Sequence, residues 1–267
     1  MTGFTKRWVL GILSTVSALV PFRSSSKTQD ATPEPPSLDT VLASFPYEVI
    51  TTTGVKALED WTRLQTADKG WPVIVGNDDD LRMMLENFSF QSEQPLHMPA
   101  DILKAAEGLS MKDLRAWQIS DGYGELDAPI GDWPTKLQSG DLGLSVASDI
   151  LTGKPYPKVH IVLVPTRNSW EVPAYLRWGG WNACPPPEYH VAILRSWHER
   201  FGTQLAGLSG DVLDLQITMP LRSKEEAMTV AKEQYIYCTD IVDQGTNDIS
   251  TLAATLIGQN WWSFWWD

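Results

Sequence analysis

The sequence predicts an α/β fold, in which helices cover a mixed sheet within a single globular body. Two short apolar runs, residues 71–76 (WPVIVG) and 160–165 (HIVLVP), are typical of strands that are buried on both faces. Residues 204–208 and 212–218 flank a Ser-Gly-Asp turn, which indicates a hairpin. Helical segments alternate with these strands, and that alternation favours a sheet with helices packed on it.

Capping residues mark the ends of the expected helices. Asn77 precedes three aspartates, Ser223 and Glu226 have the spacing of a capping box, and Gly202 and Gly258 each follow a helical segment. The helices are expected at residues 55–65, 78–88, 111–118, 189–201, 223–238 and 248–257. Residues 119–157 are rich in Gly, Pro and Asp and form either an insert or the join between two parts.

Two strands carry further expectations. In residues 212–218, Leu213 and Leu215 alternate with Asp214 and Gln216, which predicts one buried and one exposed face. The chain closes on WWSFWWD, residues 261–267. Because so many exposed aromatic rings would favour aggregation, we expect a central strand here, and an aromatic platform for a sugar or peptide is the alternative.

Composition and charge limit the class of protein. The 267 residues are 43% hydrophobic and 20% charged, and a chain of this length can bury a core without disulfides or metals. The net charge of −12 argues against nucleic acid and anionic membranes as partners, because both repel an acidic surface. Residues 1–40 hold four of the 21 Lys and Arg and three of the 33 Asp and Glu, so residues 41–267 carry a net charge of −13. The 13 Trp are unusually many.

Residues 1–22 have the layout of a secretory signal peptide. Lys6 and Arg7 precede an apolar run, residues 8–20, that is too short to span a bilayer. Residues 23–40 are rich in Ser and Pro and are interpreted as a flexible tether, which leaves residues 41–267 as the folded body. Export to the periplasm is slightly favoured, and a cytoplasmic protein with an uncleaved extension is the alternative.

Common catalytic and nucleotide-binding motifs are missing from the sequence. It contains no Walker A, G-x-S-x-G, H-E-x-x-H or G-x-G-x-x-G pattern, and no C-x-x-C or H-x-x-x-H spacing for a metal. The three aspartates at residues 78–80 would repel phosphate from the helix that they begin. No cofactor and no metal are therefore expected.

The loop at residues 178–187 (WGGWNACPPP) is the most unusual stretch of the chain. Its two glycines let the backbone turn freely and its three prolines fix the exit. It is either a rigid aromatic loop that grips a ligand or partner, or a structural loop whose Trp rings fill the core. The binding candidates are Trp178, Trp181, Asn182, Tyr237, Asp243 and Gln244.

Residues with catalytic potential follow this loop. His190 and His198 share the apolar face of a predicted helix. They act either as a general base or as metal ligands, or they are buried histidines bonded to backbone carbonyls. Cys184 and Cys238, the two cysteines, form a disulfide, join a metal site or are separate core residues. These four residues and Asp240 are the catalytic candidates.

The same residues carry a family resemblance. Its elements are WGGWN and Cys-Pro within residues 178–185, His190, WHERFG at 197–202, QY at 234–235, YC at 237–238, DIV at 240–242, QG at 244–245 and WWD at 265–267. Residues 175–267 resemble the bacterial domain-of-unknown-function 4253 family, and residues 70–76 resemble the N-terminal portion of its longer members. The resemblance implies a compact α/β domain, and it brings no activity and no catalytic residue.

These observations favour a non-enzymatic binding or interaction module of the immunity or inhibitor type. An acidic, Trp-rich surface suits a basic protein partner, since charge complementarity speeds association. The alternative is a hydrolytic enzyme, with or without a metal, that uses the catalytic candidates near the 178–187 loop. A third is a structural or regulatory subunit without a small ligand. No nucleic acid and no membrane span are expected, and the sequence leaves the oligomeric state open.

Overall fold

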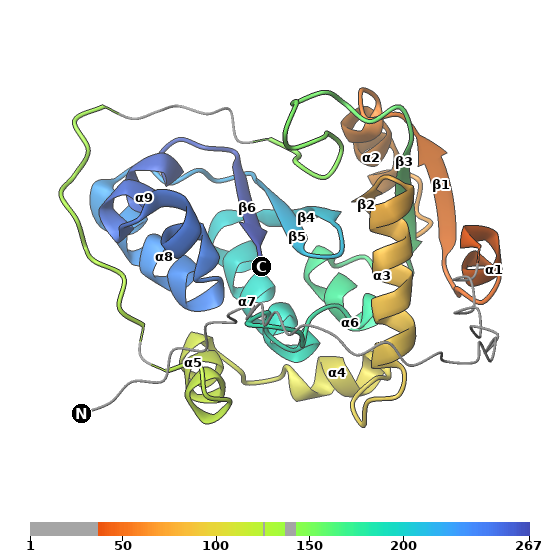
Figure 1. The fold of residues 1–267 in the computed structure, drawn as a ribbon, viewed down its shortest axis with the longest axis horizontal. Coiled ribbons are helices and arrows are strands. Elements are labelled where there is room, and N and C mark those ends of the chain that lie inside the picture. Colours follow the sequence, from red (N-terminus) through yellow and green to blue (C-terminus); the bar gives the residue numbers. More distant parts are fainter. Residues whose placement is uncertain (1–36, 125, 137–142) are drawn as a thin grey trace, which may run out of the picture. The chain divides into compact units, whose positions relative to one another are not determined.

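A six-stranded mixed sheet organises the body of the protein in the computed structural model, which describes residues 37–124, 126–136 and 143–267 (Figure 1). The strands are β1 (Glu48–Thr52), β2 (Trp71–Gly76), β3 (Val159–Val164), β4 (Thr203–Leu208), β5 (Val212–Ile217) and β6 (Trp261–Trp265). Their order is β1-β3-β2-β4-β5-β6. β2 and β4 pair in parallel at Ile74 and Gly207, and the other neighbouring strands pair antiparallel. The predicted fold class is confirmed, as is the β4–β5 hairpin.

Helices and turns of helix connect the strands. They are α1 (Leu38–Leu42), α2 (Ala57–Gln65), α3 (Asp78–Gln91), α4 (Pro99–Ala105), α5 (Met111–Ser120), the 3₁₀ turn η1 (Ser169–Glu171), α6 (Val172–Leu176), α7 (Pro187–Phe201), α8 (Lys224–Tyr237), the π-helical turn η2 (Ile241–Thr246) and α9 (Ile249–Leu256). The six predicted helices correspond to α2, α3, α5, α7, α8 and α9. The others were not predicted from the sequence, because segments of three to seven residues show too little periodicity.

The sheet has a core on each face. On one face, Leu194, Trp197 and Phe201 of α7 belong to the large core that also includes α8, α9 and the buried side chains of β4 to β6. On the other face, Trp61 and Leu64 of α2 pack with residues of β2, β3 and β4. Apolar side chains on both sides of β2 and β3 explain their unbroken hydrophobic runs.

The aromatic strand β6 lies at the edge of the sheet among the described strands, so the prediction of a central position was wrong. Trp262 and Phe264 are buried against the helices, whereas Trp261 and Trp265 on the other face are half-buried. One face of β6 is therefore well covered and the other is partly covered. The neighbouring strand is β5.

Asp214 of β5 is completely buried, which contradicts the expectation of an exposed strand face. Its carboxylate accepts hydrogen bonds from the backbone N–H of Ser145 (2.7 Å) and of Val146 (3.1 Å) and from the hydroxyl of Ser263 (2.6 Å). Burial raises the pKa of this carboxyl, and the hydrogen bonds oppose that change. The irregular chain around residue 145 thus covers the face that the strand pattern left open.

The structure agrees with some of the predicted helix-capping interactions and differs from others. Asn77 caps α3 and forms a reciprocal capping box with Asp80. Ser223 caps α8 by accepting from the N–H of Glu226, but the Glu226 carboxylate accepts from the N–H of Arg222. Gly202 ends α7 in the left-handed conformation, with φ +60°.

The predicted leader, and the predicted tether up to residue 36, lie outside the described residues. Helix α1 begins at Leu38, inside the span that was predicted as tether. Within the part of the chain that the structure describes, no helix has the length and apolar character needed to cross a bilayer.

Candidate functional site

The 178–187 loop folds tightly because of its glycines. Gly179 and Gly180 have φ of +115° and +85°, values that side-chain-bearing residues rarely adopt. A Cβ on Gly179 would lie 2.7 Å from Nε2 of His190 and would also overlap the carbonyl of Pro185. The N–H of Gly180 donates to that carbonyl at 2.9 Å, and Pro187 then begins α7. The loop is therefore closed onto the start of α7.

This closure seals a chain of polar groups in the core. Nε2 of His190 lies 3.4 Å from Sγ of Cys184, and Nδ1 of His190 lies 2.6 Å from the hydroxyl of Tyr237. All three side chains are 0% exposed. The rings of Trp178 and Trp266 pack against His190 at centroid distances of 4.8 Å and 5.6 Å. We call Cys184, His190 and Tyr237 the buried triad.

The buried triad is electrically neutral at physiological pH. Burial lowers the pKa of His190 from 6.5 to about 3, and it raises the pKa of Cys184 and of Tyr237 well above their usual values. In either tautomer, one imidazole nitrogen donates and the other accepts, so both of its hydrogen bonds are satisfied. A protonated thiol without access to solvent is a poor nucleophile.

Of the other catalytic candidates, Cys238 lies near the triad, where its charge would act on Cys184 and Tyr237, but its hydrogen bond goes outside the triad. Nδ1 of His198 lies 2.8 Å from the carbonyl oxygen of Thr203, and eight residues of helix place it about 12 Å from His190 along the axis. The Cys238 thiol is free, donates to the carbonyl of Trp265 at 2.9 Å, and has its pKa raised to about 12 by burial. Asp240 accepts from the N–H of Asp267 at 2.9 Å.

These five candidates do not converge on one cleft. Among residues 37–124, 126–136 and 143–267, no three His, Cys, Asp or Glu side chains come together in a way that could hold a metal ion. Cys184, like Cys238, is a free thiol, so the two cysteines do not form the disulfide that was one of the alternatives.

The binding candidates divide between the core and the surface. Trp178 is buried, and its indole N–H donates to the carbonyl of Ser209 at 2.7 Å. Tyr237 is buried in the triad. Trp181 is half-buried and packs edge-on against Trp178 at 5.1 Å. Asn182, Asp243 and Gln244 are exposed.

A cavity of about 150 Å³ opens beside the loop, where it meets α5, α8 and η2. Its lining residues are Gln118, Tyr123, Leu126, Ala183, Tyr235, Thr239 and Asp243. We call it the Gln118 cavity. Of the predicted binding residues, Asp243 lines it directly and Asn182 borders it, with its carbonyl accepting a hydrogen bond from the Tyr123 hydroxyl.

Gln118 gives this cavity an unusual polar group. The residue is 4% exposed, and its Nε2 donates to the carbonyl of Ile236 at 2.7 Å. Because a carbonyl only accepts, this bond fixes the amide orientation and turns Oε1 away from Ile236. Oε1 has no hydrogen-bond partner among the described residues. A buried polar atom without a partner costs about 1–3 kcal/mol unless a ligand or water satisfies it.

Other buried nitrogen atoms without a partner in the described part of the chain belong to Gln65, Arg115, Gln234, Trp262 and Trp266. None of these five residues lines the Gln118 cavity. Gln118 therefore combines a buried, unpaired acceptor with a cavity.

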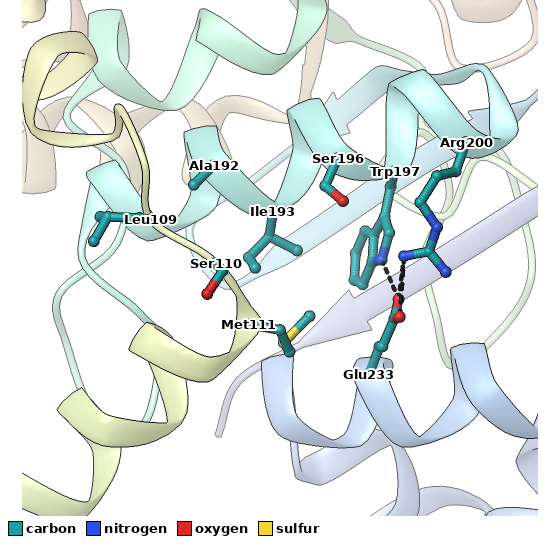
Figure 2. Close-up of a pocket in the computed structure, with 9 residues that line it drawn as sticks. All are labelled: Leu109, Ser110, Met111, Ala192, Ile193, Ser196, Trp197, Arg200 and Glu233. Carbon is teal, nitrogen blue, oxygen red and sulfur yellow. Dashed lines mark hydrogen bonds and ion pairs between the residues drawn. The ribbon is translucent and has the colours of Figure 1, made fainter.

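A larger cavity between α5, α7 and α8 provides a contrast (Figure 2). It has a volume of about 250 Å³, and the side chains of Trp197 and Arg200 point to Glu233 at its end. The Glu233 carboxylate accepts from the Trp197 indole at 3.1 Å and from Nη1 of Arg200 at 2.7 Å. The charged groups of this cavity therefore satisfy one another.

Sequence reasoning missed Gln118 and Tyr123. One signal was present: Met111, Leu114 and Gln118 have the spacing of one helix face, and Leu114 and Gln118 are both buried. Because Gln118 shares this apolar face of the helix, packing of the face buries its amide group.

The fold and this site define an α/β domain with a sealed aromatic core beside a small polar cavity. Residues 160–267 match the family model described as Domain of unknown function (DUF4253), which confirms the resemblance seen in the sequence. The match begins earlier than the predicted residue 175 and takes in all of β3 except Val159. No curated protein and no solved structure shows a significant match to the chain.

Proposed function

We propose that this chain is a non-enzymatic binding protein whose site is the Gln118 cavity. The observation that carries the proposal is the unpaired Oε1 of Gln118, held 96% buried at a cavity that reaches the surface through Asp243. Oε1 is itself shielded in the folded protein, so a small rotation of the Gln118 side chain toward the cavity would let a ligand donate a hydrogen bond to it and remove the cost of the unpaired acceptor.

The buried triad supports binding over catalysis at this end of the molecule. A general base needs a pKa near the working pH and contact with the reacting group, and a nucleophilic cysteine needs a thiolate. His190 titrates near pH 3 and is 0% exposed, so it meets neither requirement. The triad instead holds the 178–187 loop, and thereby Ala183, at the wall of the cavity.

The net charge supports a basic partner. Residues 41–267 carry −13, and an acidic surface draws a basic protein into encounter by long-range attraction. An immunity- or inhibitor-like role, in which this protein covers a basic surface, suits that charge.

The test is affinity capture from an extract of the source organism with three baits. The baits are the wild type, Ala183→Phe, which fills the Gln118 cavity, and Ser196→Phe, which fills the cavity of Figure 2 as a matched control. Mass spectrometry identifies retained proteins and small molecules, and thermal denaturation confirms that each bait is folded. We expect a component that the wild type and Ser196→Phe retain and Ala183→Phe loses. Equal retention by all three baits, or none, overturns the proposal.

A further inference from the structure

We infer that the Gln118 cavity receives a planar cation, the guanidinium group of an arginine side chain or of a free guanidino compound. The inference rests on the proposed function and names the ligand chemistry of the same site. It follows from the acceptors that line the cavity, the charges around it, its aromatic neighbours and its size.

Hydrogen-bond acceptors dominate the lining. The Asp243 carboxylate lines the cavity and receives one bond in the described structure, from the Tyr235 hydroxyl at 3.2 Å. Oε1 of Gln118 has two unused lone pairs but is shielded, so the side chain must turn toward the cavity to use them. The hydroxyl oxygen of Thr239 can also accept a hydrogen bond, whereas that of Tyr235 already interacts with the backbone of Asp127 and Ala128. The Tyr123 hydroxyl donates its hydrogen bond to the carbonyl of Asn182. A ligand rich in N–H donors is matched to this set, and a carboxylate or phosphate is not.

The charged groups around the cavity also favour a cationic ligand. Asp243 lines the cavity, and Asp121 lies close enough to Tyr123 to raise the pKa of its phenol, although burial is the larger cause. Arg115 is the cation of α5 nearest in sequence to Gln118, and its Nη2 donates to the carbonyl of Gly124. The guanidinium of Arg115 is thus bonded to the loop after α5, and it is not one of the groups that line the cavity.

Aromatic rings favour a planar cation over a compact ammonium group. Tyr123 is 38% exposed, and its ring packs on Trp117 with a centroid distance of 5.8 Å. Trp117 packs in turn on Tyr189 at 5.7 Å. Of these three rings, only that of Tyr123 lines the cavity, and the other two hold it in place. A guanidinium can stack on an aromatic ring while its N–H groups donate in its own plane, which a lysine ammonium group does not do.

The volume of the cavity sets the size of the ligand group. At about 150 Å³ it is well below the roughly 300–1,000 Å³ of sites that enclose drug-sized ligands. It therefore suits a single head group, with the rest of the ligand outside. An arginine on a basic protein meets this description.

The experiment is titration calorimetry of the full chain with n-butylguanidinium and with n-butylurea. The urea has the same planar shape but lacks the positive charge. We expect saturable one-to-one binding of butylguanidinium and binding about tenfold weaker or worse for butylurea, because charge-assisted hydrogen bonds are about twice as strong as neutral ones.

Two variants test the acceptors. Asp243→Asn removes the charge at the cavity and keeps the shape, and it should weaken butylguanidinium binding about tenfold. Asp79→Asn removes an exposed carboxylate on α3, outside the cavity, and should leave binding unchanged. Gln118→Leu removes the amide acceptor and should abolish binding, and its thermal denaturation shows whether the fold is intact. If Gln118→Leu is unfolded, Asp243→Asn still decides the question.

The outcomes separate this inference from the proposed function. Equal binding of butylurea and butylguanidinium, or no effect of Asp243→Asn, overturns the assignment of a cationic ligand and leaves the proposed binding site in place. If neither compound binds but Ala183→Phe loses its captured component, the guanidinium is also wrong and the binding function survives. If neither compound binds and capture is unaffected, both fail. A blocked Gly-Arg-Gly peptide that binds at least as tightly as butylguanidinium assigns the cation to a protein partner, and weaker peptide binding assigns it to a free compound.

Discussion

The buried triad and the Gln118 cavity lie side by side, since Ala183 lines the cavity and Cys184 belongs to the triad. The triad holds the residue types that chemistry uses, a thiol, an imidazole and a phenol, but all three are sealed and their hydrogen bonds are satisfied. The cavity holds an ordinary amide, one of whose atoms is unsatisfied. The proposed binding site therefore rests on an unsatisfied hydrogen-bond acceptor, and the residue types that usually perform chemistry are already satisfied.

The largest effect is expected from removing the centre of the triad. His190→Ala leaves a cavity and deprives both Cys184 and Tyr237 of their partner, so it should cost about 3 kcal/mol or more of unfolding free energy. His198→Ala, on the half-buried histidine of the same helix, should cost about 1 kcal/mol. Urea denaturation measures both. Similar losses for the two variants would contradict the structural role assigned to the triad.

The loop that covers the triad should be nearly as sensitive. Gly179→Ala introduces a Cβ at φ +115° against the Pro185 carbonyl and His190, and we expect it to cost about 3 kcal/mol. Gly108 also has positive φ, +79°, but nothing lies within 4 Å of a Cβ there. Gly108→Ala should therefore cost about 1 kcal/mol. Chemical denaturation of the pair isolates the close contact, and equal costs would show that the loop is not closed on His190.

Acid should lower the stability of the fold through the triad. The folded pKa of His190, about 3, is below the unfolded value of 6.5, so only the unfolded chain takes up the proton between them. This contribution to stability is complete above pH 6.5 and is lost as pH falls toward 3, by about 1.4 kcal/mol per unit. From pH 6.5 to 5 the loss is about 2 kcal/mol. Urea denaturation at both pH values should show it, and His190→Gln should lack it.

The smallest effect on stability is expected at the cavity. Asp243 is exposed, so Asp243→Asn should change the free energy of unfolding by less than about 0.5 kcal/mol. The same variant is expected to lose ligand affinity. Denaturation and calorimetry on one preparation measure the two quantities. A large loss of stability would place Asp243 with the triad as a structural group.

Local patterns predicted most of the fold. The apolar runs of β2 and β3, the hairpin at Gly210, and the capping residues Asn77 and Gly202 depend on neighbours in sequence, and the structure has each of them. β1 (Glu48–Thr52) was missed because its five residues include three that are polar.

The remaining errors come from contacts between distant segments. Asp214 is buried by chain 69 residues away at Ser145, and Gln118 finds its partner at Ile236. His190 and Tyr237 are 47 residues apart. The residues of the triad were singled out from the sequence, but their mutual contacts could not be derived from spacing. The position of β6 at the sheet edge has the same cause, since strand order is a property of the whole chain.

The strand order has a consequence for how the molecule reaches its native state. β3 pairs with β1 and β2, and β2 separates it from β4, β5 and β6. The segment that matches the family model therefore supplies strands to both sides of β2, which lies outside that segment. Synthesised alone, residues 160–267 would leave β3 without its neighbours. Because Ile74 must find Gly207 across 133 positions, we expect folding of the whole chain to be slow, in the millisecond-to-second range of proteins dominated by non-local pairing.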